Sequence, residues 1–325
     1  MENYDLIIIG GSAAATSAGI YAARRNLNFK IISKDFGGEV ATSGEIGNWP
    51  GVNETTGTEL SDKFREHLKF YGVEPEIGVE VDKITKQEDG TFCITAKKGS
   101  GSTKAGDKVS EPGESNGSTC DYVAKAVIVT TGVHPRELGI PGEKEFRNKG
   151  VSYCTTCDGP LFKDQVTVTI GGGNSALESA LMLADVAKKA YVINKNPEFK
   201  GDKLLIDKLA SKNVEVISSA STTEIIGDKL VTGVKYTDKD GNEQHLETNG
   251  IFVHIGMVPN SNIVPENVEK SKFGNIVVDK NCATNVEGLY AAGDVTDVPF
   301  NQIVIAAGMG TTALLSAVNY LNKLK

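Results

Sequence analysis

The most informative stretch of this chain reads Val166-Thr167-Val168-Thr169-Ile170-Gly171-Gly172-Gly173-Asn174-Ser175-Ala176. Its first half is a short apolar run of β-branched residues, which is typical of a buried parallel strand. The glycines keep the G-x-G-x-x-A spacing of a dinucleotide-binding turn. We expect a helix from Ser175 to Lys188 and a second strand from Ala190 to Asn194. Strand, turn, helix and strand in this order predict a βαβ unit, so the expected fold class is α/β.

The N-terminus predicts a second unit of the same kind. A strand from Asp5 to Gly10 leads into the turn Gly10-Gly11-Ser12-Ala13-Ala14-Ala15, a helix follows to Arg25, and the next strand is Phe29 to Ser33. Ser12 and Ala15 replace the second and third glycines of the motif, but both are small enough to let the backbone approach a pyrophosphate. The helix N-terminus would offer free N–H groups to the phosphates. A structural turn that binds no ligand is the alternative interpretation.

The remaining pattern places further elements around these two units. The segment from Gly99 to Ser118 is rich in glycine and serine and lacks large apolar residues, so we expect a flexible hairpin insertion there. The other expected elements are a helix at Gly57 to Tyr71, strands at Glu80 to Thr85, Thr91 to Ala96 and Lys125 to Gly132, and a final helix at Ile303 to Leu324.

The composition restricts the classes of protein to which this chain can belong. Apolar residues make up 39% of the 325 positions and charged residues 23%, which is typical of a globular protein large enough for two domains. The formal net charge of -8 argues against binding to nucleic acid or to anionic membranes. No uninterrupted apolar run is long enough to span a membrane, and the acidic start of the chain does not resemble a secretory signal. We therefore expect a cytoplasmic protein.

Cys154 and Cys157 are the cysteines whose spacing suggests chemistry. Two cysteines three positions apart can close a small disulfide, and such spacing often lowers the pKa of one thiol so that its thiolate attacks at neutral pH. Half of a zinc site is the alternative, but the 4 histidines stand alone in the sequence, and we expect no metal. Asp158 follows the pair and can either exchange a proton with a thiolate or cap a turn.

Three further cysteines, Cys93, Cys120 and Cys282, have no partner at redox spacing. Because a cytosol keeps thiols reduced, we expect them to be structural cysteines outside any disulfide framework. Cys120 borders the glycine- and serine-rich segment, where its thiol would be open to oxidation.

Four motifs together resemble those of the low-molecular-weight thioredoxin reductases, and the resemblance covers nearly the whole chain. The motifs are Cys154-Thr155-Thr156-Cys157-Asp158-Gly159-Pro160, Gly37-Gly38-Glu39 through Asn48-Trp49-Pro50-Gly51, the turn from Gly171 to Ala176, and Ala292-Gly293-Asp294-Val295. The resemblance implies two interleaved Rossmann-like dinucleotide-binding domains of the three-layer ββα/βαβ type. Residues 1–135 and 256–325 would form an FAD-binding domain, and residues 136–255 an inserted NAD(P)H-binding-like domain that carries the redox pair.

The resemblance also implies roles for individual residues. Cys157 would face the flavin, Cys154 would attack the disulfide of thioredoxin or a thioredoxin-like protein, and Asp158 would transfer a proton. The residues implied for FAD binding are Gly10, Ser12, Ala13, Ala14, Gly38, Glu39, Val40, Asn48, Gly132, Gly293, Asp294, Asn301, Gln302 and Ile303. Members of this family form dimers, so a homodimer is expected.

The electron donor is the point at which the chain departs from the NADPH-dependent members of that family. Those members carry a His-Arg-Arg run after the second strand of the inserted unit, whereas this chain has Asn194-Lys195-Asn196 followed by Lys200. Lysine cannot reproduce the planar, two-point grip of arginine on a phosphate. Some relatives lack that clamp and are reduced by ferredoxin, and this chain resembles that subgroup, so we expect ferredoxin in place of NADPH, with NAD(P)H binding left open. Two other functions fit the same motifs: an FAD-dependent dithiol oxidase that uses oxygen, and a non-catalytic redox-sensing module.

Overall fold

The computed structural model describes residues 2–43, 45–98 and 120–324. The chain divides into two compact units, which we call the first unit (Met1–His134 and Val258–Lys325) and the second unit (Pro135–Met257). The second unit is thus inserted into the first, and its junctions lie beside the expected boundaries at 135/136 and 255/256. The hairpin insertion expected at Gly99 to Ser118 lies outside the described residues.

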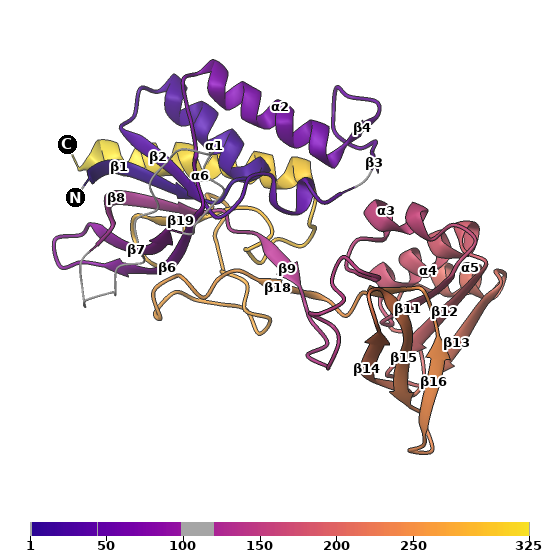
Figure 1. Cartoon of the computed structure of the whole chain (residues 1–325). Coiled ribbons are helices and arrows are strands. Elements are labelled where there is room, and N and C mark those ends of the chain that lie inside the picture. The colour runs from indigo at the N-terminus through magenta and orange to yellow at the C-terminus, as the bar shows by residue number, and fades with distance from the viewer. Residues whose placement is uncertain (1, 44, 99–119, 325) are drawn as a thin grey trace. The chain divides into compact units, whose positions relative to one another are not determined.

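The first unit is built on a mixed 7-stranded sheet (Figure 1). The strand order is β5-β2-β1-β8-β7-β6, and β19 also pairs with β8. Neighbours among β5, β2, β1, β8 and β19 are parallel, whereas β8, β7 and β6 pair antiparallel. The strands are β1 (Glu2–Ile9), β2 (Phe29–Ser33), β5 (Glu76–Ile77), β6 (Val79–Lys86), β7 (Phe92–Lys98), β8 (Tyr122–Val129) and β19 (Leu289–Ala291).

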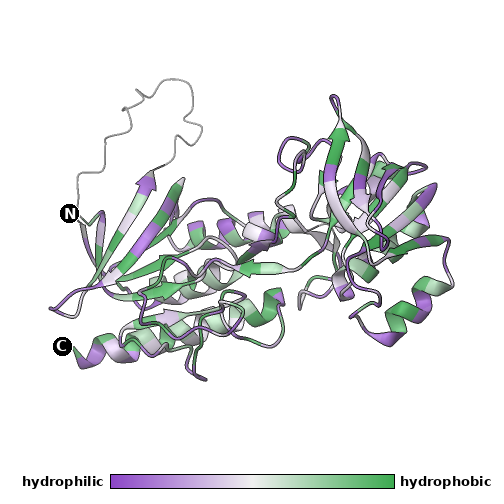
Figure 2. Ribbon diagram, turned by 90° about the horizontal axis from the view of Figure 1, so that it is seen from below, coloured by the Kyte–Doolittle hydropathy of each residue, from purple (hydrophilic) through white to green (hydrophobic). Residues whose placement is uncertain are grey.

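Alternate residues of β1 belong to two separate cores. Leu6 and Ile8 pack against the helices α1 (Ala13–Arg24), α2 (Gly57–Phe70) and α6 (Ile303–Lys323). Ile7 and Ile9 pack on the other face of the sheet, against side chains of β6 and β7. This division follows from the two-residue period of a strand. Figure 1 shows the three helices together on one side of the sheet, and Figure 2 shows that its central strands are hydrophobic.

Helix α6 packs closely on α1. A Cβ at Gly310 would lie 2.1 Å from the carbonyl oxygen of Ala14, so only glycine permits this approach. By length and composition, α6 is the one helix in the described part of the chain that could cross a membrane, but the core helix of a globular protein passes the same test. The buried residues of its inner face are Gly310, Ala313, Leu314, Ala317, Val318 and Leu321.

A capping box defines the start of α2. The Thr56 hydroxyl accepts a hydrogen bond from the N–H of Glu59 at 3.3 Å, and the Glu59 carboxylate accepts one from the N–H of Thr56 at 3.1 Å. These two bonds satisfy N–H groups that a helix start otherwise leaves free. The other short elements of the chain are β3 (Glu45–Ile46), β4 (Thr55–Thr56), β9 (Val133–Pro135), β18 (Met257–Pro259), α3 (Thr155–Asp158), and the 3-10 turns η1 (Gly38–Val40) and η2 (Gly159–Phe162).

The second unit has three layers around a parallel sheet. Its 5 strands follow the order β10-β17-β11-β12-β13. Helices α4 (Asn174–Val186) and α5 (Lys203–Ala210) pack on one face, and the antiparallel sheet β14-β15-β16 packs on the other. The predicted α/β class and the predicted unit β11-α4-β12 are confirmed. The strands are β10 (Val151–Ser152), β11 (Val166–Ile170), β12 (Lys189–Asn194), β13 (Val214–Ser218), β14 (Ser221–Gly227), β15 (Val231–Thr237), β16 (Glu243–Glu247) and β17 (Gly250–Val253).

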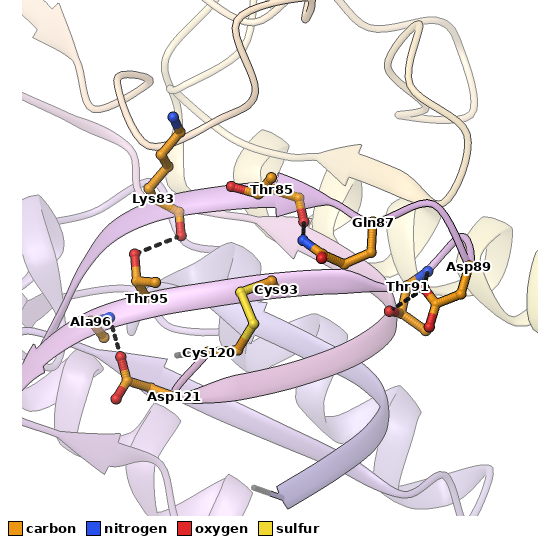
Figure 3. Close-up of a disulfide and its surroundings, with 10 residues drawn as sticks. All are labelled: Lys83, Thr85, Gln87, Asp89, Thr91, Cys93, Thr95, Ala96, Cys120 and Asp121. Carbon is orange, nitrogen blue, oxygen red and sulfur yellow. Dashed lines mark hydrogen bonds between the residues drawn. A yellow bond between two sulfur atoms is a disulfide. The ribbon is translucent and has the colours of Figure 1, made fainter. Parts of the chain in front are cut away.

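One expectation about the cysteines is wrong. Cys93 and Cys120 form a disulfide with each other across a sequence separation of 27 (Figure 3). Cys93 lies in β7 and Cys120 shortly before β8, and the pairing of these strands brings the two cysteines together. Because the contact arises from strand pairing, the spacing of the cysteines in the sequence does not reveal it. Cys282 is buried and free.

Candidate active site and cofactor-binding residues

The first glycine turn lies at the carboxyl end of β1. Gly10 has a φ of +131°, and a Cβ there would lie 2.3 Å from the carbonyl oxygen of Thr130, so no side chain fits. Ser12 stands at the N-cap of α1, but its hydroxyl donates to the carbonyl of Gly37 at 2.6 Å and does not cap the helix. The first turn of α1, which holds Ala13 and Ala14, therefore presents its N–H groups without a capping side chain, as a phosphate site requires.

Asp294 has an unsatisfied buried oxygen at the end of β19. The preceding Gly293 packs against Ala14 of α1 and Ala306 of α6. Among the described residues, Asp294 Oδ1 has no hydrogen-bond partner, and burial raises the pKa of this carboxyl. Buried carboxylate oxygens are normally hydrogen-bonded, so this one suits a ligand that carries hydroxyl groups. The residues of this turn thus fit a dinucleotide such as FAD.

Glu39 adds a second acidic group near Asp294. Although Glu39 keeps an exposed surface, partial burial of its carboxylate raises its pKa. The negative charge of Asp35 raises this pKa further, the charge of His134 opposes the shift, and Asp294 adds a smaller increase. Glu39 belongs to η1, in which Gly38 approaches Ser12 and Val40 is buried. The sequence-predicted residues of α1, η1 and the β19 turn therefore lie in one region of the first unit.

Asn48 and Gln302 meet across 254 positions of sequence. The Asn48 amide donates to Oε1 of Gln302 at 3.2 Å. Gln302 is the N-cap of α6, whose first residue, Ile303, packs on the cluster that contains Ala13. Asn301 is exposed beside them. The structure thus brings together residues that the resemblance had placed around one flavin from opposite ends of the chain.

Gly132 lies where the two segments of the chain near the boundaries of the inserted unit are hydrogen-bonded to each other. The Thr131 hydroxyl donates to the carbonyl of Asn260 at 2.7 Å, and the Asn260 amide donates to the carbonyl of Thr131 at 2.8 Å. A backbone bond from Asn260 N–H to the Gly132 carbonyl, at 3.0 Å, completes the contact. These bonds hold Gly132 beside the end of β8.

The redox motif begins at the half-buried Cys154, which is disulfide-bonded. Cys157 is part of α3, and its side chain lies outside the described residues. The Ser152 hydroxyl donates to the Asp158 carboxylate at 2.6 Å and accepts from the N–H of Cys154 at 3.0 Å. Asp158 occupies the N-cap of η2, but its side chain makes no capping bond. Its carboxylate is therefore tied to the backbone of Cys154 through Ser152.

His254 also belongs to this site, although it stands alone in the sequence. Its Nε2 lies 2.8 Å from Oγ1 of Thr155, which is also 2.6 Å from Oγ of Ser179 in α4. Burial lowers the pKa of His254 to about 4, so that its ring is neutral at physiological pH. One signal was available in the sequence: His254 directly follows an apolar strand, and ligand sites of parallel sheets lie beyond the carboxyl ends of strands.

The second glycine turn is closed by the loop that follows β12. Asn194 is buried and donates to the carbonyl of Glu198 at 3.0 Å. The N–H of Lys200 donates to the carbonyl of Gly172 at 2.8 Å. Asn174, the first residue of α4, donates from its amide to Asp202 at 3.0 Å and accepts from the N–H of Asp202 at 2.7 Å. A carboxylate thus stands at the helix end where a pyrophosphate would bind.

Comparisons with known proteins agree with this geometry. A family model described as pyridine nucleotide-disulphide oxidoreductase matches residues 4–310. The chain is 39% identical to a protein named NADH dehydrogenase from Bacillus subtilis (strain 168) over 322 residues, which are 98% of this chain and 59% of that protein. The chain therefore spans about three fifths of the length of the curated relatives it matches.

Two solved structures are also similar. The crystal structure of T. acidophilum thioredoxin reductase has a TM-score of 0.75 and 36% sequence identity, and the match covers 100% of both chains. A ferredoxin-flavin thioredoxin reductase from Clostridium acetobutylicum has a TM-score of 0.50 and 29% identity over 100% of this chain and 99% of the other.

Proposed function

Because the chain belongs to the pyridine nucleotide-disulphide oxidoreductase family, we propose that it is a reductase that passes electrons through a Cys154–Cys157 disulfide to thioredoxin or a similar small protein. It is a flavin-dependent disulfide oxidoreductase, and its cofactor is FAD. The observation that carries the proposal is the disulfide-bonded Cys154 at the start of α3. A likeness to a thioredoxin reductase over the full length of both chains supports the choice of substrate.

The proposed reaction is a thiol–disulfide exchange. FAD, when bound, supplies two electrons, and these electrons together with two protons convert the Cys154–Cys157 disulfide into two thiols. The Cys154 thiolate then attacks one sulfur of thioredoxin, which breaks the thioredoxin disulfide, forms a mixed disulfide and releases one thioredoxin thiolate. The Cys157 thiolate attacks Cys154 in that mixed disulfide, which re-forms the enzyme disulfide and releases the second thioredoxin thiolate.

We assign proton exchange with these thiolates to Asp158. Its bond to Ser152, which in turn accepts from the N–H of Cys154, supports a place close to the redox pair. A carboxylate at such a place can take and return the protons that the exchange requires. We assign Cys157 as the thiolate that exchanges its proton with Asp158, and this assignment comes from the sequence motif.

We propose that the first unit holds the FAD. The N–H groups of α1 would bind the pyrophosphate, with Gly10 and Ser12 providing the close approach. Asp294 and Glu39 would accept hydrogen bonds from hydroxyl groups of the cofactor. The remaining residues proposed to line the cofactor are Ala13, Ala14, Gly38, Val40, Asn48, Gly132, Gly293, Asn301, Gln302 and Ile303.

We propose ferredoxin, in place of NADPH, as the electron donor. Lys195 and Lys200 are exposed and offer no planar grip on a 2′-phosphate. Asp202 brings a negative charge to the first residue of α4, which disfavours a pyrophosphate at that helix end. The likeness to a protein named NADH dehydrogenase makes NADH the competing donor. Homodimer formation and a cytoplasmic location stay predictions.

Anaerobic titration of the purified flavoprotein tests both the donor and the route. We expect reduced ferredoxin to bleach the flavin and to drive reduction of thioredoxin, and micromolar NADPH to leave the flavin oxidised. In the Cys154→Ser variant, ferredoxin should still bleach the flavin but thioredoxin should stay oxidised, because the exchanging thiol is gone. Cys282→Ser serves as the matched control and should keep the wild-type rate, since Cys282 is buried in a hydrophobic core of the first unit and is not part of the motif.

Three results would contradict the proposal. Rapid bleaching by NADPH or NADH would overturn the choice of donor. Full thioredoxin reduction by Cys154→Ser would refute the route. Fast oxygen consumption with a small dithiol, without any thioredoxin reduction, would favour the dithiol oxidase instead.

A further inference from the structure

A buried polar cluster fastens the redox helix to the sheet of the second unit. It consists of Thr155 in α3, Ser179 in α4, Thr169 in β11 and His254 at the end of β17. Thr155 Oγ1 is 2.6 Å from Ser179 Oγ and 2.8 Å from His254 Nε2, and Ser179 Oγ is 3.4 Å from Thr169 Oγ1. Thr155 and Ser179 are 5% and 3% exposed. A network this buried is rigid when its members are satisfied.

The protonation state of His254 suits this position. Burial keeps the ring neutral at physiological pH. A neutral imidazole has one donor and one acceptor nitrogen, and a hydroxyl can serve either of them. Thr155 can therefore bond to His254 and Ser179 at once, without an unpaired buried charge. Because proton exchange with the thiolates is assigned to Asp158, the proposed reaction gives His254 no role.

Helix α3 is too short to be stable as an isolated helix. It contains 4 residues, and a helical turn of this length is unstable without tertiary contacts. Thr155 is its first residue and directly follows Cys154. The bonds of Thr155 to α4 and to the end of β17 are thus contacts that can keep the backbone around Cys154 in place.

We infer that His254 is a positioning residue for the redox pair: by holding Thr155, it keeps Cys154 in the geometry in which its disulfide closes. This inference deepens the proposed function and rests on it for the role of Cys154. Two electrons and two protons convert the disulfide to thiols, and His254 neither gains nor loses a proton in that step. Its effect is to keep the two thiols at a high effective concentration, which favours the disulfide.

The midpoint potential of the Cys154 disulfide tests this role. Full-length flavoprotein is equilibrated with mixtures of oxidised and reduced dithiothreitol, and the thiols are then labelled and assigned by peptide mass. In His254→Ala we expect the disulfide to be about tenfold easier to reduce, which for a two-electron couple is a potential ~30 mV more positive. His254→Gln keeps a donor and an acceptor and should restore most of the wild-type value. His245→Ala, an exposed histidine in β16 of the same unit, should not change it.

A wild-type potential in a folded His254→Ala protein, or equal shifts in the Ala and Gln variants, would overturn the inference. If His254→Ala does not fold, Thr155→Val replaces it, because valine keeps the shape of threonine and removes only the hydroxyl. A potential unchanged in Thr155→Val would then overturn the inference. The potential needs neither donor nor thioredoxin, so a missing thioredoxin activity with shifted potentials would refute the proposed function and leave this inference standing.

Discussion

Asp294 is a residue at which the proposed binding of FAD and the stability of the protein without FAD have opposite requirements. Its raised pKa means that, without FAD, the folded chain keeps the proton more readily than the unfolded chain does. Stability of the protein without FAD therefore falls as the pH rises above the ordinary range for aspartate, and it recovers at a pH below both pKa values. Among the described residues, Oδ1 of this carboxylate has no hydrogen-bond partner. A buried oxygen of this kind is expected where a ligand provides the partner.

The substitution Asp294→Asn tests this account, because asparagine has a similar shape and carries no charge. Without FAD, we expect the variant to melt at a higher temperature than the wild type at pH 7 and at the same temperature in acid. With FAD, we expect about tenfold weaker binding, since a hydrogen bond to a charged acceptor is worth roughly 1.5–3 kcal/mol. Thermal melts of the two apoproteins and calorimetric titration with FAD give both values.

Asp62→Asn is the control for this measurement, because Asp62 is exposed on α2 in the same unit. It should change neither the melting temperature nor the affinity for FAD. An unchanged affinity in Asp294→Asn would show that the carboxylate does not contact the cofactor.

At the scale of elements, the disulfide between Cys93 and Cys120 joins β7 to the start of β8 (Figure 3). Within the described residues, these strands share the short register Phe92↔Ala124, Cys93↔Val123 and Ile94↔Tyr122. Beside the disulfide, the Asp121 carboxylate accepts from the N–H of Ala96 at 2.8 Å. The covalent bond thus adds to a pairing of these two strands that is short in the described residues.

Removal of this disulfide should lower the free energy of unfolding by about 3 kcal/mol, because the unfolded chain loses the constraint of a closed loop. We expect Cys93→Ser, Cys120→Ser and the double variant to lose nearly the same amount, since each of them lacks the cross-link. Urea unfolding of the wild type and the three variants without added reductant, followed by circular dichroism, measures this loss. Additive losses in the double variant would mean that the cysteines contribute as separate side chains and not as a bond.

At the scale of the whole molecule, each unit has hydrophobic cores of its own. The cores of the first unit contain residues from β1, β8, α1 and α6, and those of the second contain residues from β11, β12, β17 and α4. The chain should therefore unfold as two units. All of the residues proposed to bind FAD belong to the first unit.

FAD should accordingly stabilise one unit alone. Differential scanning calorimetry of the protein with and without FAD should show two transitions, of which one moves upward with FAD and the other stays in place. A free FAD concentration 1,000 times the Kd stabilises the binding unit by about 4 kcal/mol. A single transition, or two transitions that move together, would indicate that the units unfold as one.

Several elements of both units could be predicted from the sequence, because their signals are local. A run such as Val166 to Ile170 has the period and composition of a buried strand, and it is β11 with those bounds. The same holds for β2 at Phe29 to Ser33. The glycine at position 10 is likewise a local requirement of the turn, so its place at the end of β1 followed from the motif.

The contacts that build the site are not local, and they appear only when the chain is folded. Asn48 meets Gln302, Cys93 meets Cys120, and His254 meets Thr155, because the packing of strands, helices and turns brings separate segments together. Spacing in the sequence does not specify this packing, since segments that touch in the folded protein can be far apart in the chain. The motifs therefore predict which elements form and which residues carry the chemistry, whereas the folded chain sets which side chains hold those residues in place.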